Sequence, residues 1–154
     1  MVLANTNIEG LGDHEIAHRE KRIAEANSDM AAYARAWVPN VISAASRQKT
    51  DLVSAIAMMV ADCPPEVHER QNRALMVRPD ATQFLPQLNF PVLLVTGAAD
   101  HLSTPASNDG IAERLRDAEV RTIDDAGHLL PFERPEELGM TIREWIRRKH
   151  ITRS

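Results

Sequence analysis

An aspartate and a histidine, Asp100 and His128, have the types and positions that acid–base chemistry requires. A carboxylate beside an imidazole accepts the Nδ1 proton, fixes the tautomer of the ring and stabilises the imidazolium. Nε2 is then free to take a proton from a nucleophile or from water. Asp100 lies three residues past Gly97 and His128 lies five past Ile123, where we expect two strands to end. The intervening chain must fold back for the two side chains to meet.

The segments around these residues have the pattern of a parallel sheet. Residues 90–97 are a continuous apolar run that ends at a glycine, which predicts a strand covered on both faces. Residues 120–123 predict a second short strand, and helices are predicted to begin at residues 103–105 and at Pro135. Ligands and catalytic groups gather at the carboxyl ends of parallel strands, so we expect the aspartate and the histidine at one edge of the sheet.

The first half of the chain has helical periodicity. After a short strand at residues 2–4, we predict four helices that begin at Asp13, after Ser28, at residue 50 or 51, and at Pro65. Asp13 and Ser28 are the predicted N-caps of the first two. The predicted apolar stripes are Ile16, Ala17, Ile23 and Ala24 on the first helix, Met30, Tyr33, Ala34, Trp37 and Val38 on the second, and Leu52, Val53, Ile56, Met59, Val60 and Cys63 on the third.

Two loops resemble those of one enzyme family. Residues 97–105 (GAADHLSTP) are similar to the acid-bearing loop of α/β-hydrolases, and residues 125–136 (DAGHLLPFERPE) are similar to their catalytic-histidine loop. The resemblance runs throughout residues 90–146 and is looser over residues 1–89. The family's chain order is nucleophile, acid, histidine. The resemblance therefore implies Asp100 as the triad acid and His128 as the general base and acid.

The same resemblance implies an α/β chain with a partial α/β-hydrolase fold: a short parallel sheet, flanking helices and a helical cap. Its implied parts are residues 1–12, a strand remnant and loop of the core; residues 13–78, the four-helix cap; and residues 79–154, the α/β core with both loops. No glycine is spaced as a G-x-S-x-G elbow around Ser, Cys or Asp, and the oxyanion loop is missing too. We therefore expect the C-terminal half of the fold, inactive alone.

Two functions follow from these features. The resemblance implies a hydrolase of small-molecule carboxylic esters or lactones, whose nucleophile lies in a missing N-terminal half. The alternative is a non-catalytic fragment, truncated or decayed, that serves as a binding or interaction module. A sheet of about three strands leaves an apolar edge that invites self-association or pairing with another chain.

Composition excludes several other classes. The 154 residues are 44% hydrophobic, enough for a packed core, and a net charge of −4 without a basic stripe argues against nucleic acid as a partner. The single cysteine, Cys63, permits no internal disulfide. No secretory signal and no run of roughly 18 apolar residues is present. We expect a cytoplasmic protein with no cofactor, no metal and no membrane segment.

Simpler interpretations of these residues stay open. Asp100 can cap a turn or the following helix, and His128 can be an ordinary surface histidine. A metal site formed by both with His101 matches no known ligand spacing. Helix capping is the simpler role for Ser103 and Ser107, and core packing is the simpler role for three residues that could line a substrate pocket: Trp37, Met58 and Met59.

Overall fold

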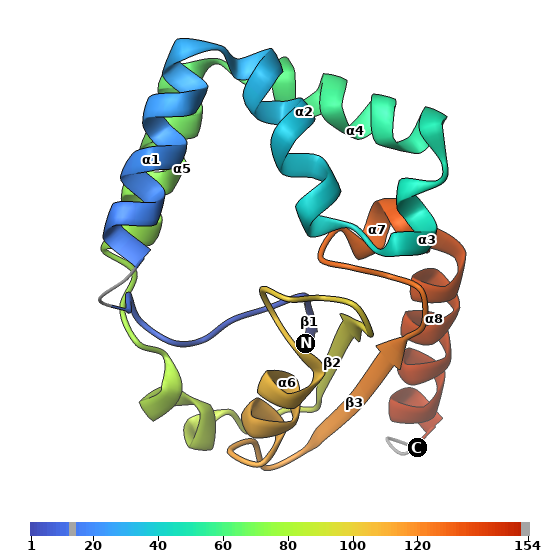
Figure 1. The fold of residues 1–154 in the computed structure, drawn as a ribbon. Coiled ribbons are helices and arrows are strands. Elements are labelled where there is room, and N and C mark those ends of the chain that lie inside the picture. Colours follow the sequence, from blue (N-terminus) through green and yellow to red (C-terminus); the bar gives the residue numbers. More distant parts are fainter. Residues whose placement is uncertain (13–14, 152–154) are drawn as a thin grey trace. The chain divides into compact units, whose positions relative to one another are not determined.

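The computed structural model describes residues 1–12 and 15–151, and their chain path is shown in Figure 1. Asp13, the predicted N-cap of the first helix, lies outside the described residues. The described chain forms two compact units. The sheet unit contains Met1–Asn7, Val41–Gln48 and the chain from Thr82 onward, and the helical unit contains Ile8–Asn40 and Lys49–Ala81. Residues 41–48 therefore belong to the sheet unit, although they lie within the predicted helical range 13–78.

Three parallel strands form the sheet: β1 (Val2–Ala4), β2 (Val92–Gly97) and β3 (Ala118–Ile123), in the order β1-β2-β3. This arrangement confirms the predicted α/β class with a short parallel sheet. All residues of β2 are buried, as expected for a central strand covered on both faces. Val2 pairs with Leu93, and Gly97 pairs with Ile123. The strands thus end near one another at the same edge.

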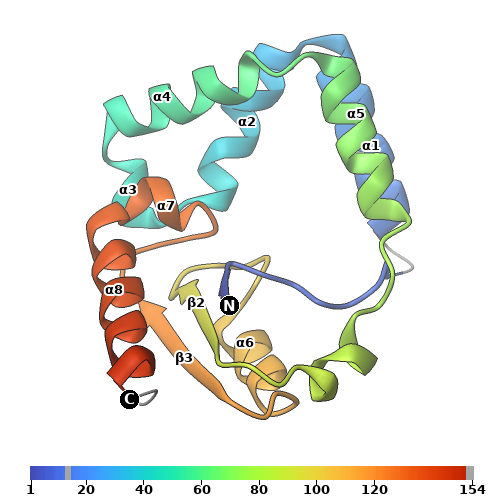
Figure 2. The same ribbon diagram turned by 180° about the vertical axis from the view of Figure 1, so that it is seen from behind.

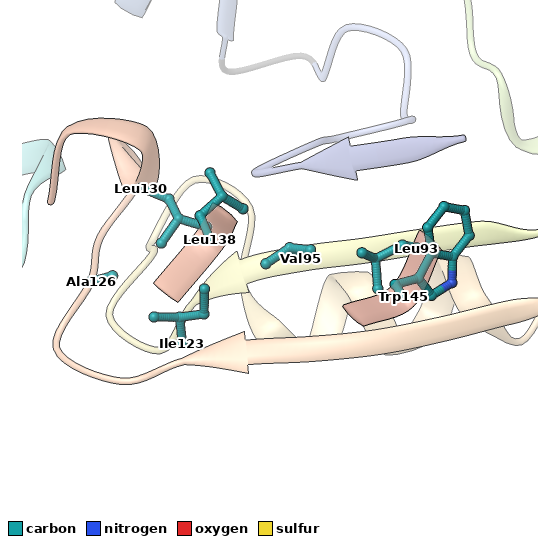
Figure 3. Close-up of a cluster of buried hydrophobic side chains, with 7 residues drawn as sticks. All are labelled: Leu93, Val95, Ile123, Ala126, Leu130, Leu138 and Trp145. Carbon is teal, nitrogen blue, oxygen red and sulfur yellow. The ribbon is translucent and has the colours of Figure 1, made fainter. Parts of the chain in front are cut away.

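The helices of the sheet unit are α3 (Ala44–Arg47), α6 (Pro105–Ala112), α7 (Leu130–Glu133) and α8 (Pro135–Ile151), with a 3₁₀ helix, η1 (Thr82–Gln87). Helix α8 covers one sheet face, where its Leu138 and Trp145 pack on Leu93, Val95 and Ile123 (Figure 3). Helix α6 contacts β2 and β3 from the other face (Figure 1). Each fully buried Leu, Ile or Val side chain stabilises the fold by about 1.5–3 kcal/mol. Packing on both faces therefore fixes the strands that lead to the loops.

The helical unit contains α1 (Glu15–Ser28), most of α2 (Met30–Val41), α4 (Thr50–Ala61) and α5 (Pro65–Met76). Helices α1 and α5 lie side by side in both views (Figures 1 and 2). The guanidinium of Arg78 donates to both carboxylate oxygens of Glu15 at 2.9 Å and to the carbonyl oxygen of Glu9 at 2.8 Å. Arg78 therefore joins the segment that follows α5 to the start of α1 and to the segment that precedes α1.

Several sequence-based expectations for the helical unit were wrong in detail. Ser28 does not cap the second helix: it is the last residue of α1, and Asp29 takes that role by accepting the N–H of Ala32 at 2.9 Å. The predicted stripe of α1 is also shifted, since Ile23 and Ala26 are its buried residues. The exposed members of the predicted stripe are Ile16, Ala17 and Ala24. Between α2 and α4 the chain also forms a short helix, α3, which was not predicted and which belongs to the sheet unit.

Side chains of the second helix follow the predicted pattern more closely. Met30 and Tyr33 are buried with Ala26, and Trp37 packs against this cluster as a core residue does. On α4, Ile56 of the predicted stripe is buried, but Met58 and Met59 are exposed. The expected core packing of these two methionines, and the place of Met59 in the predicted stripe, were therefore wrong. Among the described residues, no helix combines the length and apolar character that a bilayer-spanning segment needs.

Candidate active site

Each of the three strands leads into a loop that carries a polar side chain. Asn5 follows β1 directly, Asp100 follows β2 after two alanines, and His128 lies in the loop after β3. Because the strands are parallel and in register, these loops leave the sheet at one edge. The three side chains come together there through hydrogen bonds.

The carboxylate of Asp100 and the imidazole of His128 form the centre of the site. Nδ1 of His128 lies 3.0 Å from Oδ2 of Asp100. The Asp100 side chain is fully buried, whereas 28% of the His128 side chain is exposed. An ionised carboxylate only accepts hydrogen bonds, so this contact places the ring proton on Nδ1. The structure thus brings together the two residues that the sequence singled out.

A tight turn fixes the acid. The N–H groups of Leu102 and Ser103 donate to Oδ1 of Asp100 at 2.8 and 2.9 Å, and the N–H of Asp100 itself donates to the carbonyl oxygen of Gly97. The turn-capping interpretation of Asp100 therefore holds alongside its contact with the histidine. One carboxylate oxygen caps the turn and the other faces the ring.

Ser103 supports this turn and does not cap the next helix. Its buried hydroxyl donates to the carbonyl oxygen of Thr6 and accepts from Nδ2 of Asn108 at 3.2 Å. The cap of α6 is Thr104, whose hydroxyl oxygen accepts the N–H of Ser107 at 3.1 Å. The predicted capping roles of Ser103 and Ser107 were therefore wrong, because the threonine between them occupies the N-cap position.

Opposing effects act on the pKa of Asp100. Burial raises the pKa, because it penalises the charged form. Hydrogen bonds from His128, Asn5 and the backbone of Ser103 lower it and outweigh burial, so the pKa of Asp100 lies below its ordinary value. The carboxylate is ionised at neutral pH, the state that orients a histidine base.

A second buried carboxylate, Glu133, holds the histidine loop from the α7 side. Its Oε1 accepts the N–H of Gly127 at 2.8 Å, and its Oε2 accepts the N–H of Ser43 at 2.8 Å. The Ser43 hydroxyl donates to the carbonyl oxygen of Asp125 at 2.7 Å, and the N–H of His128 donates to the carbonyl oxygen of Val41 at 2.8 Å. The loop is thus fixed by hydrogen bonds to its backbone at Asp125, Gly127 and His128.

Two glycines allow the loops to approach each other. A Cβ added at Gly97 would overlap the carbonyl oxygens of Ala126 and Gly127. A Cβ added at Gly127 would lie 2.7 Å from the carbonyl oxygen of Val41 and 2.9 Å from the backbone of Ile42. Only a residue without Cβ fits at either position, so the spacing between the acid loop and the histidine loop depends on both.

The free nitrogen of His128 defines what the site can do. No described residue hydrogen-bonds to Nε2, and the ring is partly open to solvent. A histidine held through Nδ1 by a carboxylate can transfer a proton at Nε2. His101 is exposed, and the described His, Cys, Asp and Glu side chains form no group of three or more that could hold a metal.

Asn5 and Glu133 were missed in the sequence. Asn5 directly follows a strand, the position that drew attention to Asp100, but an amide has no acid–base role and was passed over. Glu133 lies in a charged, proline-flanked run that is typical of an exposed helix start, yet it is only 3% exposed. One of its partners, Ser43, lies 90 positions away, so no local pattern reveals that Glu133 is buried.

Comparisons with known proteins bear on the fold that carries these residues. No family model matches the sequence. A thermophilic esterase from Thermogutta terrifontis is similar over 96% of this chain and 55% of its own, with a TM-score of 0.88 and 27% identity. An enol-lactonase from Burkholderia xenovorans LB400 is similar over 94% and 55%, with a TM-score of 0.81 and 22% identity. An α/β-hydrolase from a Medee basin deep-sea metagenome is similar over 90% and 52%, with a TM-score of 0.68 and 20% identity.

A sequence similarity points to a different kind of protein. Polyketide synthase ThaQ of Burkholderia thailandensis is 42% identical over 53 residues, which are 34% of this chain and 2% of that protein. The structural matches cover nearly the whole chain and carry more weight. The chain has a partial α/β-hydrolase fold, and it spans about half the length of the solved structures that it matches.

Proposed function

We propose that this chain supplies the acid and the histidine of a hydrolase that acts on small-molecule carboxylic esters or lactones. Asp100 is the acid, and His128 is the general base and acid. The contact of 3.0 Å between Nδ1 of His128 and Oδ2 of Asp100, which leaves Nε2 unbonded, carries this proposal. The similar esterase and enol-lactonase support the choice of substrate class.

The geometry suits a two-step proton transfer. Nε2 of His128 takes the proton of a hydroxyl nucleophile as its oxygen attacks the carbonyl carbon, and the Nδ1–H of the resulting imidazolium stays hydrogen-bonded to the carboxylate of Asp100. Nε2 then gives the proton to the leaving oxygen as the ester bond breaks, which leaves an acyl-enzyme. Water repeats the cycle on the acyl-enzyme and releases the acid. Asp100 remains ionised throughout.

The nucleophile in this scheme comes from a second segment. None of the described serines, threonines or cysteines hydrogen-bonds to Nε2 of His128. Strand β1 is an edge strand of the described sheet, with one side open to further pairing. We propose that an N-terminal half-fold pairs there and brings the nucleophile and the oxyanion donors.

A complementation assay tests this function. The chain is mixed with the separately expressed N-terminal part of the Thermogutta terrifontis esterase, and hydrolysis of p-nitrophenyl acetate is followed. We expect activity from the mixture and little from either part. The His128→Ala variant should lower the rate of the mixture by about 100-fold or more. A mixture that associates but shows equal rates with and without His128 would contradict the catalytic role.

The alternative function is a binding module without catalysis. The same open edge of β1 favours it, because an unpaired strand is a template for pairing with another chain or a second copy. Size-exclusion chromatography with light scattering separates the two. Self-association that persists in the presence of the half-fold, with no ester hydrolysis, would favour the module.

A further inference from the structure

We propose that Asn5 is a positioning residue, whose side-chain amide holds the carboxylate of Asp100 against His128 and links that carboxylate to the backbone of the histidine loop. The proposal rests on the proposed function, since the position of the acid matters most if His128 works as a base. Asn5 touches no reacting atom in that scheme. It acts through the two residues that do.

The contacts of the amide link both loops. Nδ2 of Asn5 donates to Oδ2 of Asp100 at 2.7 Å and to the carbonyl oxygen of Gly127 at 3.2 Å. Oδ2 is the same carboxylate oxygen that faces Nδ1 of His128, and Gly127 directly precedes that histidine. One NH₂ group therefore spans the acid and the backbone that carries the base.

The orientation of the amide is determined by its surroundings. Nδ2 faces two acceptors, a carboxylate oxygen and a carbonyl oxygen, which both need a donor. A flipped amide would place Oδ1 against these acceptors, and three oxygens would repel one another. Oδ1 is buried and has no hydrogen-bond partner among the described residues. The site thus leaves one polar atom unsatisfied in order to keep the donor on Asp100.

The backbone of Asn5 aims the side chain. Its φ of 49° lies in the left-handed region, which asparagine tolerates better than most residues. Its N–H still donates to the carbonyl oxygen of Val95 at 2.9 Å, so the ladder between β1 and β2 continues up to this residue. The hydrogen bond to β2 thus fixes the backbone of Asn5, and its left-handed conformation directs the side-chain amide to the acid loop.

Within the described part of the chain, four donors hold the carboxylate of Asp100. Leu102 and Ser103 donate to Oδ1, and Asn5 and His128 donate to Oδ2. The turn donors fix the carboxylate to its own loop. Among the described residues, Asn5 is the one side chain besides His128 itself that ties this carboxylate to the histidine loop. The backbone keeps the two loops together, since the N–H of Ala99 donates to the carbonyl oxygen of Ala126 at 2.8 Å. Without the amide, however, Oδ2 of Asp100 can turn away from His128, and the imidazole is free to move its proton from Nδ1 to Nε2.

The tautomer of His128 is therefore the measurement that tests the proposal. It is read from the ¹⁵N shifts of the imidazole in the full chain labelled at histidine, at a pH where the ring is neutral. Asn5→Gly removes the amide and keeps the left-handed turn. Asn27→Ala is the matched control, since it removes another amide–carboxylate bond, to Glu69 at 3.1 Å, in the helical unit.

We expect the Nδ1–H form in the wild type and in Asn27→Ala, and a several-fold rise of the Nε2–H form in Asn5→Gly. A wild-type tautomer in folded Asn5→Gly would overturn the proposal and leave the proposed function intact. A wild type in the Nε2–H form would instead overturn the Asp100–His128 pair, and the proposed function with it.

A second measurement needs no variant. The side-chain NH₂ resonances of Asn5 in the wild type should shift with the protonation of His128, because both groups share Oδ2 of Asp100. An Asn5 amide that does not respond while His128 titrates would overturn the proposal, even if Asn5→Gly does not fold.

Discussion

The carboxylate of Glu133 accepts the N–H of Gly127 at 2.8 Å, one residue before the histidine of the site. Its other oxygen accepts the N–H of Ser43, so a single buried side chain joins the histidine loop to the segment at residues 41–48. A buried charge is tolerated when hydrogen bonds satisfy it. The position of His128 thus depends on a carboxylate that performs no chemistry.

Replacing Glu133 should therefore weaken the fold around the site. Glu133→Gln turns one of the two acceptors into a donor that faces a backbone N–H. We expect the free energy of unfolding to fall by about 2 kcal/mol, as for loss of a hydrogen bond to a buried charged group. Urea denaturation measures this. Glu144→Gln on the exposed side of α8 is the control, and equal midpoints for both variants would refute the role of Glu133.

The two close-approach glycines should not tolerate a methyl group. Gly97→Ala and Gly127→Ala each place a Cβ against backbone atoms that cannot move independently. We expect each to lower the free energy of unfolding by about 2 kcal/mol or more, as overpacking does. Gly110→Ala within α6 is the matched control, where only the end of Arg114 is near and alanine favours the helix. Thermal unfolding of all three, monitored by circular dichroism, would show no difference if the glycines are incidental.

Acid should remove the stabilisation that Asp100 provides. Its pKa in the folded protein lies below the ordinary value of 3.8, so the unfolded state binds the proton more readily. The stabilisation is fully present above that ordinary value and is lost as the pH falls through it toward the folded pKa. We expect the stability difference between wild type and Asp100→Asn to be constant from pH 7 to about 5 and to shrink below that. Denaturation across this pH series tests the sign.

His68 in the helical unit should respond to pH in a higher range. Burial, with a smaller effect of Arg22, lowers the pKa of this imidazole. Its Nε2 lies 3.1 Å from Nδ2 of Asn72. Its ring packs edge-on against the ring of Tyr33, with 4.9 Å between the ring centroids. The neutral form is favoured by folding, so its contribution is present above the ordinary value of 6.5 and declines as the pH falls below it. His68→Gln should flatten the stability profile between about pH 7 and 5. A slope equal to that of the wild type would contradict this.

The strands and the loops after them could be predicted from the sequence because their signals are local. The apolar run of β2 and the prolines that open α5, α6 and α8 act within a few residues. The meeting of Asp100 with His128 followed from one topological rule about parallel strands. Nothing local distinguishes Ser28 from Asp29 as the cap of α2, since both side chains suit that position. The contact of Asn5 with Asp100 spans 95 positions and that of Glu133 with Ser43 spans 90, so no local pattern reveals either.

A double-mutant cycle on ester hydrolysis tests the catalytic pair most directly. The rates of the complemented protein are compared for wild type, Asp100→Asn, His128→Ala and the double variant. If the aspartate acts only through the histidine, each single variant should lose about 100-fold or more. The double variant should then be no slower than His128→Ala, because groups that act as a unit are not additive. Losses that multiply in the double variant, or a single variant as fast as the wild type, would contradict a working Asp100–His128 pair.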